Sequence, residues 1–331
     1  MALKTIEYRQ LIHIVIIFMI VQFAGILLAT QVFNNQTYTS AVSAQIDSSP
    51  ISALFFVLYI VIISALLLFL IKRFKASSII IIWERLIVLV TSFFVFYIVL
   101  STTSYGIFGN STKPLFIYIP TAIAGALALL LLYEKIRRPN FRNTAAIISS
   151  IGVGLLLGLG FGPIFALVVF FLLAIYDFIA VFITRHMIAL ANVAMQNNLA
   201  LMVDVSEYAA VPRSSLSSSQ LSAYRDAIKS KAINIPDDIK NAVKGSITIP
   251  ASVALGTGDL AMPLMLSVSF YKLYLNFTLS MFIAIGGVFG LILTMLILKR
   301  FKRALPAIPP ILFGILCSLL AYFLIFGTLA I

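Results

Sequence analysis

The sequence predicts an all-α, polytopic membrane protein with nine transmembrane helices. Of its 331 residues, 62% are hydrophobic and only 10% are charged, which is too few charges to cover the surface of a soluble domain. The apolar residues form long unbroken runs, unlike the short alternating segments of a membrane barrel. Because a helix satisfies its own backbone hydrogen bonds in lipid, a helical bundle is the expected architecture.

Nine apolar runs are long enough to cross about 30 Å of hydrocarbon at about 1.5 Å per residue. They cover residues 11–32, 51–71, 80–100, 115–133, 144–160, 163–184, 248–271, 277–298 and 306–330. The fifth run gives the weakest signal, since it is short and contains Gly152, Gly154, Gly158 and Gly160. Nine spans place the two termini on opposite sides of the membrane.

The basic residues predict the orientation of these spans, because Lys and Arg are enriched in cytoplasmic loops. With nine spans, 21 of the 23 basic residues fall on the side of the N-terminus, and only Lys113 and Lys272 fall on the other. We therefore expect a cytoplasmic N-terminus and a C-terminus outside. Lys4 and Arg9 precede the first run as in a secretory signal, but its length and the absence of a convincing cleavage site favour a retained span. The net charge of +12 comes from short clusters without interleaved aromatics, so no nucleic-acid partner is expected.

The spans divide the chain into three parts. Residues 1–184 hold the first six spans, residues 185–247 form a polar cytoplasmic segment, and residues 248–331 hold the last three spans. Within the polar segment, residues 187–203 mix apolar and amide side chains, which predicts an amphipathic helix at the membrane surface. The serine-rich residues 214–219 are expected to be mobile, and apolar residues at helical spacing over 221–228 predict a short surface helix.

Two aspartates lie inside predicted spans. The chain has eleven acidic residues, of which nine, including Glu84, were assigned to span edges or loops, and the exceptions are Asp177 and Asp259. A carboxylate within the bilayer costs about 3 kcal/mol or more and usually marks a functional site. The depth of each aspartate can be measured from the cytoplasmic end of its span. Asp177 lies roughly 12 Å along the helix from Arg185, and Asp259 lies roughly 16 Å from Thr248 if that helix is regular. The two carboxyl groups are therefore expected at similar depth.

Paired carboxyl groups have a characteristic chemistry. Two of them a few ångströms apart do not both ionise easily, so the pair tends to hold one shared proton. One member can then act as a general base on water while the other donates a proton to a carbonyl oxygen, which is the chemistry of amide hydrolysis without a covalent intermediate. The pair alone is equally compatible with a proton relay in a transporter.

Three short motifs accompany the aspartates. Asp177 lies in YDFIAVF on span six, Asp259 ends GTGD on span seven, and LPAIP begins at Leu305 at the start of span nine. In this order and on these spans, the chain resembles the presenilin and signal peptide peptidase family of intramembrane aspartyl proteases. Ile308 stands where that family usually has leucine. The predicted orientation resembles the presenilin branch, since signal peptide peptidases place the catalytic spans the other way round.

The resemblance implies that Asp177 and Asp259 are catalytic and that the residues around them support the pair or bind substrate. The supporting residues are Tyr176, Gly256, Thr257, Gly258, Leu305, Pro306, Ala307 and Ile308. The glycines would let a substrate strand approach, or would serve helix packing. The prolines of LPAIP would leave carbonyl groups available to an extended peptide, or would begin a helix. Tyr176 would hydrogen-bond near the pair or pack as an ordinary aromatic, and the hydroxyl of Thr257 would help to wet the site.

Other chemistries lack their residues. The chain has only two histidines and no HExxH motif, so a zinc protease is excluded, and no GxSG motif supports a rhomboid-type serine mechanism. A proton- or cation-coupled transporter or ion-leak channel would use the same two aspartates, and a broken helix near Gly256 would suit it. No convincing inverted repeat supports that alternative. Two GxxxG pairs, Gly154–Gly158 and Gly286–Gly290, are expected to serve internal helix packing more than partner contacts.

The resemblance also implies the surroundings in which the protein works. We expect an integral protein of the cell membrane that cleaves transmembrane-helix substrates within the lipid bilayer and needs neither a cofactor nor a metal. The short tails and modest polar segment suggest a microbial, single-chain enzyme. A homo-oligomer and accessory subunits both remain compatible with the sequence.

Overall fold

The computed structural model describes residues 8–34, 50–74, 77–108, 115–138, 140–183, 199–212, 246–301 and 305–327. The chain divides into two units, one of residues 1–14 and 204–254 and the other of residues 15–203 and 255–331. Residues 187–198 of the predicted amphipathic helix lie outside the described residues, as do the serine-rich stretch 214–219 and the predicted surface helix over 221–228.

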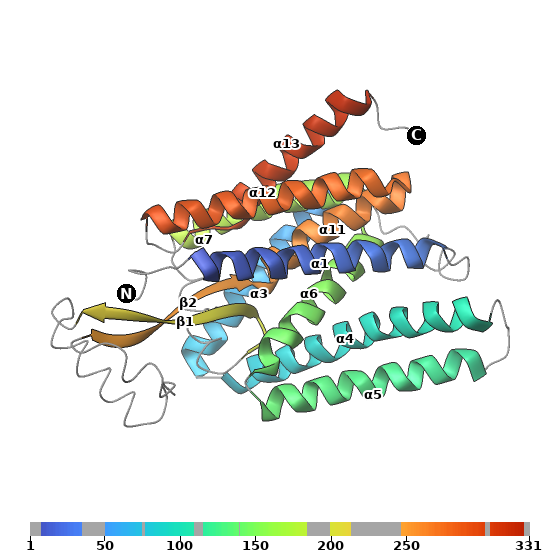
Figure 1. Ribbon diagram of the computed structural model, residues 1–331, viewed down its shortest axis with the longest axis horizontal. Helices are drawn as coiled ribbons and strands as arrows, with labels where there is room; N and C mark the ends of the chain where they lie inside the picture. The colour runs from blue at the N-terminus through green and yellow to red at the C-terminus, as the bar shows by residue number, and fades with distance from the viewer. Residues whose placement is uncertain are drawn as a thin grey trace. The chain divides into compact units, whose positions relative to one another are not determined.

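The described residues contain nine α-helices, shown in Figure 1. They are α1 (Tyr8–Asn34), α3 (Pro50–Phe74), α4 (Ser77–Phe108), α5 (Leu115–Arg137), α6 (Phe141–Gly160), α7 (Pro163–Phe182), α11 (Thr257–Tyr274), α12 (Phe277–Phe301) and α13 (Ile308–Phe326). Each predicted span overlaps one of these helices, so the all-α, polytopic architecture is confirmed. Within the described ranges, seven helices are long and apolar enough to cross a membrane.

One prediction about the seventh span is wrong at its start. Residues 246–256 form strand β2 (Ser246–Gly256), which pairs with β1 (Met202–Pro212) in a two-stranded sheet (Figure 1). Residues Ile247, Thr248, Ile249 and Val253 are β-branched, and Pro250 would cost about 3 kcal/mol inside a helix. Residues 202–203 likewise begin a strand and do not end an amphipathic helix.

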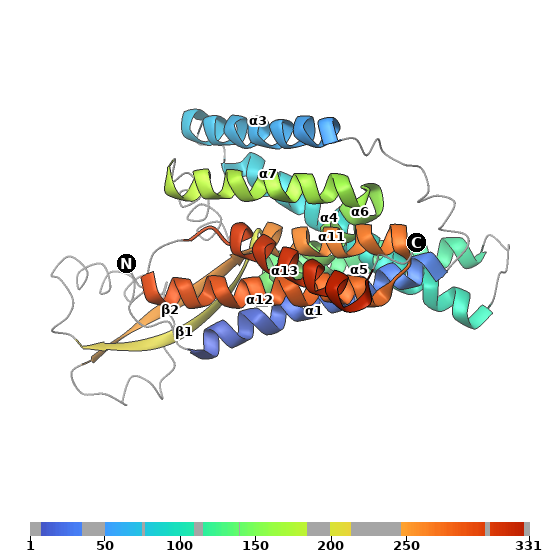
Figure 2. The same ribbon diagram turned by 90° about the horizontal axis from the view of Figure 1, so that it is seen from above.

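Because α11 begins only at Thr257, Asp259 is the third residue of its helix. The estimate that placed Asp259 eleven helical residues beyond Thr248 is therefore wrong. The helix packs against α6, α7, α12 and α13, so neighbours surround it on most sides, as Figure 2 also shows. Its sequence is apolar around the whole circumference and its buried positions run almost without a break from Leu260 to Tyr271. This burial fixes the helix that carries Asp259 at the centre of the bundle.

Glycines allow the closest helix contacts of the bundle. A Cβ on Gly154 would lie 2.8 Å from the side chain of Leu264, and a Cβ on Gly158 would lie 2.8 Å from the backbone oxygen of Met265, so both face α11. Gly290 on α12 lies against the backbone of Pro310 and Ile311 on α13. The prediction that both GxxxG pairs serve internal packing is confirmed, and the glycine-rich fifth span is a packed helix.

Candidate active site

Asp177 lies on α7, on the face that packs against α11 and α13. Other buried residues of the helix, Ala174, Ala180 and Val181, lie three or four positions away, so the carboxyl group is on the buried face of α7. The residue is only 5% exposed. Its Oδ2 atom accepts a hydrogen bond from the backbone N–H of Ile308 at 3.2 Å, and the backbone of Ala307 also interacts with the carboxyl group. The LPAIP segment therefore contacts the first aspartate through its backbone.

Asp259 is half-buried in the first turn of α11. Its carboxyl group interacts with the backbone amide of Gly256, the residue that caps the helix. An acidic side chain at this position commonly reaches back to the capping amide and satisfies a donor that has no partner within the helix. The same carboxyl group is also within electrostatic reach of Asp177. The structure thus brings together three segments that are far apart in sequence.

The two glycines of GTGD differ in their surroundings. A Cβ on Gly256 would lie 3.2 Å from Oδ2 of Asp259, with no other group nearer than that side chain. A Cβ on Gly258 would meet nothing within 4 Å, and Gly258 is exposed. Among the residues that the structure describes, neither glycine packs against another helix, so helix packing does not account for this motif there. Gly256 leaves room for the carboxyl group of Asp259, and Gly258 leaves the space beside it open.

The remaining predicted residues also lie near the two aspartates in the fold. Pro306, Ala307 and Ile308 are buried where α13 begins, and Leu305 before them is partly buried. Pro309 lies in the first turn of α13, so the helix-start explanation holds for that proline. Tyr176 is partly buried on α7 beside Asp177.

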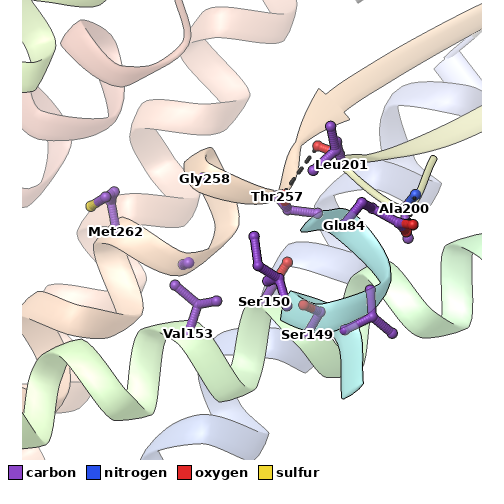
Figure 3. A pocket seen from close by; sticks show the side chains of 12 residues that line it. Glu84, Ser149, Ser150, Val153, Ala200, Leu201, Thr257, Gly258 and Met262 are labelled. Carbon is purple, nitrogen blue, oxygen red and sulfur yellow. Dashed lines mark hydrogen bonds between the residues drawn. The ribbon is translucent and has the colours of Figure 1, made fainter. Parts of the chain in front are cut away.

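Thr257 has a structural partner that was not foreseen. Its backbone N–H and its hydroxyl both donate to the backbone oxygen of Leu201, at 3.0 and 3.1 Å (Figure 3). The expectation that this hydroxyl wets the site is therefore not supported by its contacts, because the hydroxyl serves to fix the start of α11.

Comparison with known proteins identifies the family. A sequence profile described as "Signal-peptide peptidase, presenilin aspartyl protease" matches residues 15–328, nearly the whole chain. The chain belongs to this family. It is accordingly a multi-pass integral membrane protein and an intramembrane aspartyl protease of the presenilin family, and its substrates are membrane proteins.

Solved structures agree in fold. The chain is similar to a presenilin family intramembrane aspartate protease crystallised in space group C222, with a TM-score of 0.52 and 18% identity over 93% of this chain and 96% of that one. A crystal form of such a protease in space group P2 gives a TM-score of 0.53 and 18% identity over 94% and 96% of the two chains. No curated protein matches the sequence. At this identity the structural likeness supports the fold alone.

Sequence reasoning missed one buried polar group of this protease. Glu84 on α4 is 2% exposed and forms an ion pair with Lys135 on α5, with both carboxylate oxygens 2.7 Å from Nζ. The sequence placed both residues at span edges. Spans three and four run in opposite directions, so the start of one lies beside the end of the other. Comparing the depths of Glu84 and Lys135 in the membrane would therefore have indicated that the two side chains can meet.

A cavity of about 210 Å³ lies between α4, α6 and the start of α11 (Figure 3). Its lining is mainly apolar and includes Val153, Gly258, Ala261 and Met262. Every polar side chain in the lining has a partner within the protein: Glu84 binds Lys135, Ser149 binds Thr91, Ser150 binds the oxygen of Ala146, and Thr257 binds the oxygen of Leu201. The first turn of α11 therefore borders unfilled space on this side.

Proposed function

We propose that Asp177 and Asp259 are the catalytic pair of an endopeptidase that hydrolyses peptide bonds within transmembrane segments. The observation that carries the proposal is the convergence of the three motifs: the Ile308 amide donates to Asp177, and Asp177 acts electrostatically on Asp259. Membership of the protease family favours hydrolysis over the transporter alternative.

The pair would act by activating water. One carboxylate accepts a proton from water as the oxygen attacks the carbonyl carbon of the scissile bond, while the other carboxyl group donates its proton to the carbonyl oxygen. The tetrahedral gem-diol then collapses: the protonated carboxyl group gives its proton to the amide nitrogen, a gem-diol hydroxyl returns a proton to the other carboxylate, and the C–N bond breaks. The pair ends with one shared proton, as it began, so no covalent intermediate and no cofactor is required.

The open space beside Gly258 supports an approach by substrate from that side. A peptide bond in a helix is protected by intrahelical hydrogen bonds, so a substrate must unwind locally before it reaches the pair. A side chain at position 258 would project into the open space next to Asp259, whereas glycine leaves it to the incoming backbone. We propose that Leu305, Pro306 and Ala307 border the same bound segment, because they lead into the start of α13, where the backbone of Ala307 interacts with the Asp177 carboxyl group.

We propose that the N-terminus and the polar segment 185–247 are cytoplasmic and that the C-terminus is outside the cell membrane. The distribution of 21 basic residues against two supports this orientation. Single cysteines can test it, because the chain has one cysteine, Cys317, that can first be replaced by serine. A membrane-impermeant maleimide added to intact cells should label a cysteine at position 112 and spare one at position 76, and the reverse pattern would contradict the proposal.

The decisive experiment is cleavage of a single-span substrate by the purified protein in detergent. We expect the parent to cut within the span and Asp177→Asn and Asp259→Asn each to abolish cutting while their melting temperatures stay near that of the parent. Glu134→Gln is the matched control, because it removes a carboxylate that pairs with Arg138 at the end of α5. If the parent cuts nothing but carries a proton or cation flux that needs both aspartates, the transporter alternative replaces the protease mechanism.

A further inference from the structure

The Glu84–Lys135 ion pair is buried to an unusual degree. The Glu84 side chain is 1% exposed and the Lys135 side chain is 5% exposed, and both carboxylate oxygens contact Nζ at 2.7 Å. Removing two charges from water costs as much as their attraction returns, so a buried pair seldom adds much stability compared with apolar residues of the same volume. Its value to the protein must therefore lie in what it holds in place.

Glu84 holds the segment that follows α7 and precedes the sheet. Its Oε1 atom accepts a hydrogen bond from the backbone N–H of Ala200 at 2.9 Å. The same segment packs by its apolar side chains, since Leu199 and Met202 form a buried cluster with Ile80 of α4. Residues 199–202 are therefore attached to the start of α4 by both a charge-assisted hydrogen bond and apolar contacts.

That segment in turn holds the start of α11. The backbone oxygen of Leu201 accepts two hydrogen bonds from Thr257, one from its N–H at 3.0 Å and one from its hydroxyl at 3.1 Å. The first N–H groups of a helix have no partner within the helix, so an acceptor fixed elsewhere in the fold determines where the helix begins. Figure 3 shows Glu84, Ala200, Leu201 and Thr257 close to one another at one side of the cavity.

The cavity makes these contacts more important. Thr257, Gly258, Ala261 and Met262 border a cavity of about 210 Å³, so side-chain packing restrains this side of the helix start less than a filled interior would. The two hydrogen bonds that Thr257 donates to the backbone oxygen of Leu201 add to that restraint. Asp259 lies two residues after Thr257, on the same helical turn.

We propose that Glu84 and Lys135 are positioning residues that hold Asp259 in register through Ala200, Leu201 and Thr257. The inference rests on the proposed catalytic role of Asp259. A displacement of about 1 Å in a catalytic group can lower a rate by about 10²-fold, so loss of this restraint should reduce kcat without a comparable change in substrate affinity.

Two neutral replacements of the pair separate positioning from stability. The Gln/Gln variant (Glu84→Gln with Lys135→Gln) keeps an oxygen that can accept a hydrogen bond from the Ala200 amide. The Leu/Met variant (Glu84→Leu with Lys135→Met) removes that acceptor. Neither double variant leaves a buried charge without its partner, which single substitutions would do. The control is Arg138→Gln, because it breaks an ion pair just beyond the end of α5, where the arginine side chain is 66% exposed.

We expect the kcat of the Leu/Met variant to fall by about tenfold or more, with KM within about twofold of the parent. Its melting temperature should be close to that of the Gln/Gln variant. The Gln/Gln variant and Arg138→Gln should keep kcat within about threefold of the parent. A shifted helix start should also change the position of cleavage, which mass spectrometry of the products measures. Parent-like kcat in the Leu/Met variant, or equal losses in both double variants, would overturn the proposal.

Thr257→Val gives a second test that does not touch the ion pair. It removes the hydroxyl contact with Leu201, so kcat should fall by about threefold or more at unchanged KM. When Thr257→Val is combined with the Leu/Met variant, the fold-loss in kcat should be smaller than the product of the two separate fold-losses, because both changes act on the same restraint. Parent-like kcat in Thr257→Val, or fully multiplicative losses, would overturn the inference. If Asp259→Asn still cuts, the proposed function itself has failed; if Asp259→Asn is inactive while the Leu/Met variant cuts like the parent, only the positioning role has failed.

Discussion

The backbone N–H of Ile308 lies 3.2 Å from the Oδ2 atom of Asp177, although 131 residues separate them in sequence. The contact uses the main chain of the LPAIP segment, and the side chain of Ile308 is buried elsewhere in the fold. The identity of the side chain at this position therefore matters less to Asp177 than the presence of an amide hydrogen. This explains in physical terms why isoleucine can stand where the family usually has leucine.

The first prediction compares two substitutions of Ile308. Ile308→Pro removes the amide hydrogen and disfavours the helical conformation of Ala307 before it, so kcat should fall by about tenfold or more. Ile308→Leu keeps the amide and nearly the same volume, so cleavage should remain within about threefold of the parent. Steady-state kinetics on a single-span substrate measure both. Equal activity in the two variants would show that the amide does not support Asp177.

A second prediction separates the two glycines of GTGD. In Gly256→Ala the new Cβ would lie 3.2 Å from Oδ2 of Asp259, so the carboxyl group must shift and kcat should fall by about threefold to thirtyfold. In Gly258→Ala the Cβ meets no protein atom, and alanine favours the helix by about 0.5–1 kcal/mol, so the melting temperature should stay the same or rise.

Activity should nevertheless fall in Gly258→Ala, chiefly through KM, because the added methyl group occupies the space left to substrate. Melting temperatures and kinetic constants of the two variants, measured together, test this contrast. A marked loss of thermal stability in Gly258→Ala would contradict it.

The sequence alone predicts most of the bundle, for a reason specific to lipid. Runs of about twenty apolar residues have few alternatives to a helix in hydrocarbon, so each of the nine predicted spans overlaps one of the nine described helices. The same physics singles out Asp177 and Asp259, since an acidic residue within a span is expensive. Their convergence with LPAIP agrees with the predicted site, and their catalytic role stays a prediction.

Two features are hard to predict from single segments because they depend on partners distant in sequence. The short apolar run 246–256 continues directly into the seventh span, and although Pro250 and its β-branched residues favour a strand, its partner strand lies in residues 202–212, far away in sequence. Glu84 follows a tryptophan and precedes Arg85, so it looks like an ordinary charge at a span edge. Its burial becomes visible only when α4 and α5 lie side by side and bring Lys135 to it.

A third prediction concerns the contact between α12 and α13. A Cβ on Gly290 would lie 2.5 Å from the Cα of Ile311, so Gly290→Ala must separate the two helices and should cost about 1–3 kcal/mol of stability. Because α13 also carries Ile308 in its first turn, activity should fall with stability. Gly125→Ala on α5 is the matched control, since its Cβ would meet nothing within 4 Å. Similar melting temperatures for the two variants would contradict the close-contact argument.

The last prediction concerns Gln22, a buried amide on α1 that is 1% exposed. Its Nε2 atom donates to the backbone oxygen of Leu260 at 2.9 Å, one residue after Asp259, so it ties α1 to the first turns of α11. Gln22→Leu removes the donor and should destabilise the protein by about 1 kcal/mol, and kcat should fall by a few-fold because the turn that carries Asp259 loses a restraint. Gln31→Leu, at an exposed position on the same helix, is the control and should leave both quantities near those of the parent. Thermal unfolding in detergent and cleavage kinetics measure the two effects. If Gln22→Leu behaves like Gln31→Leu in both measurements, the α1 contact does not restrain the helix that carries Asp259.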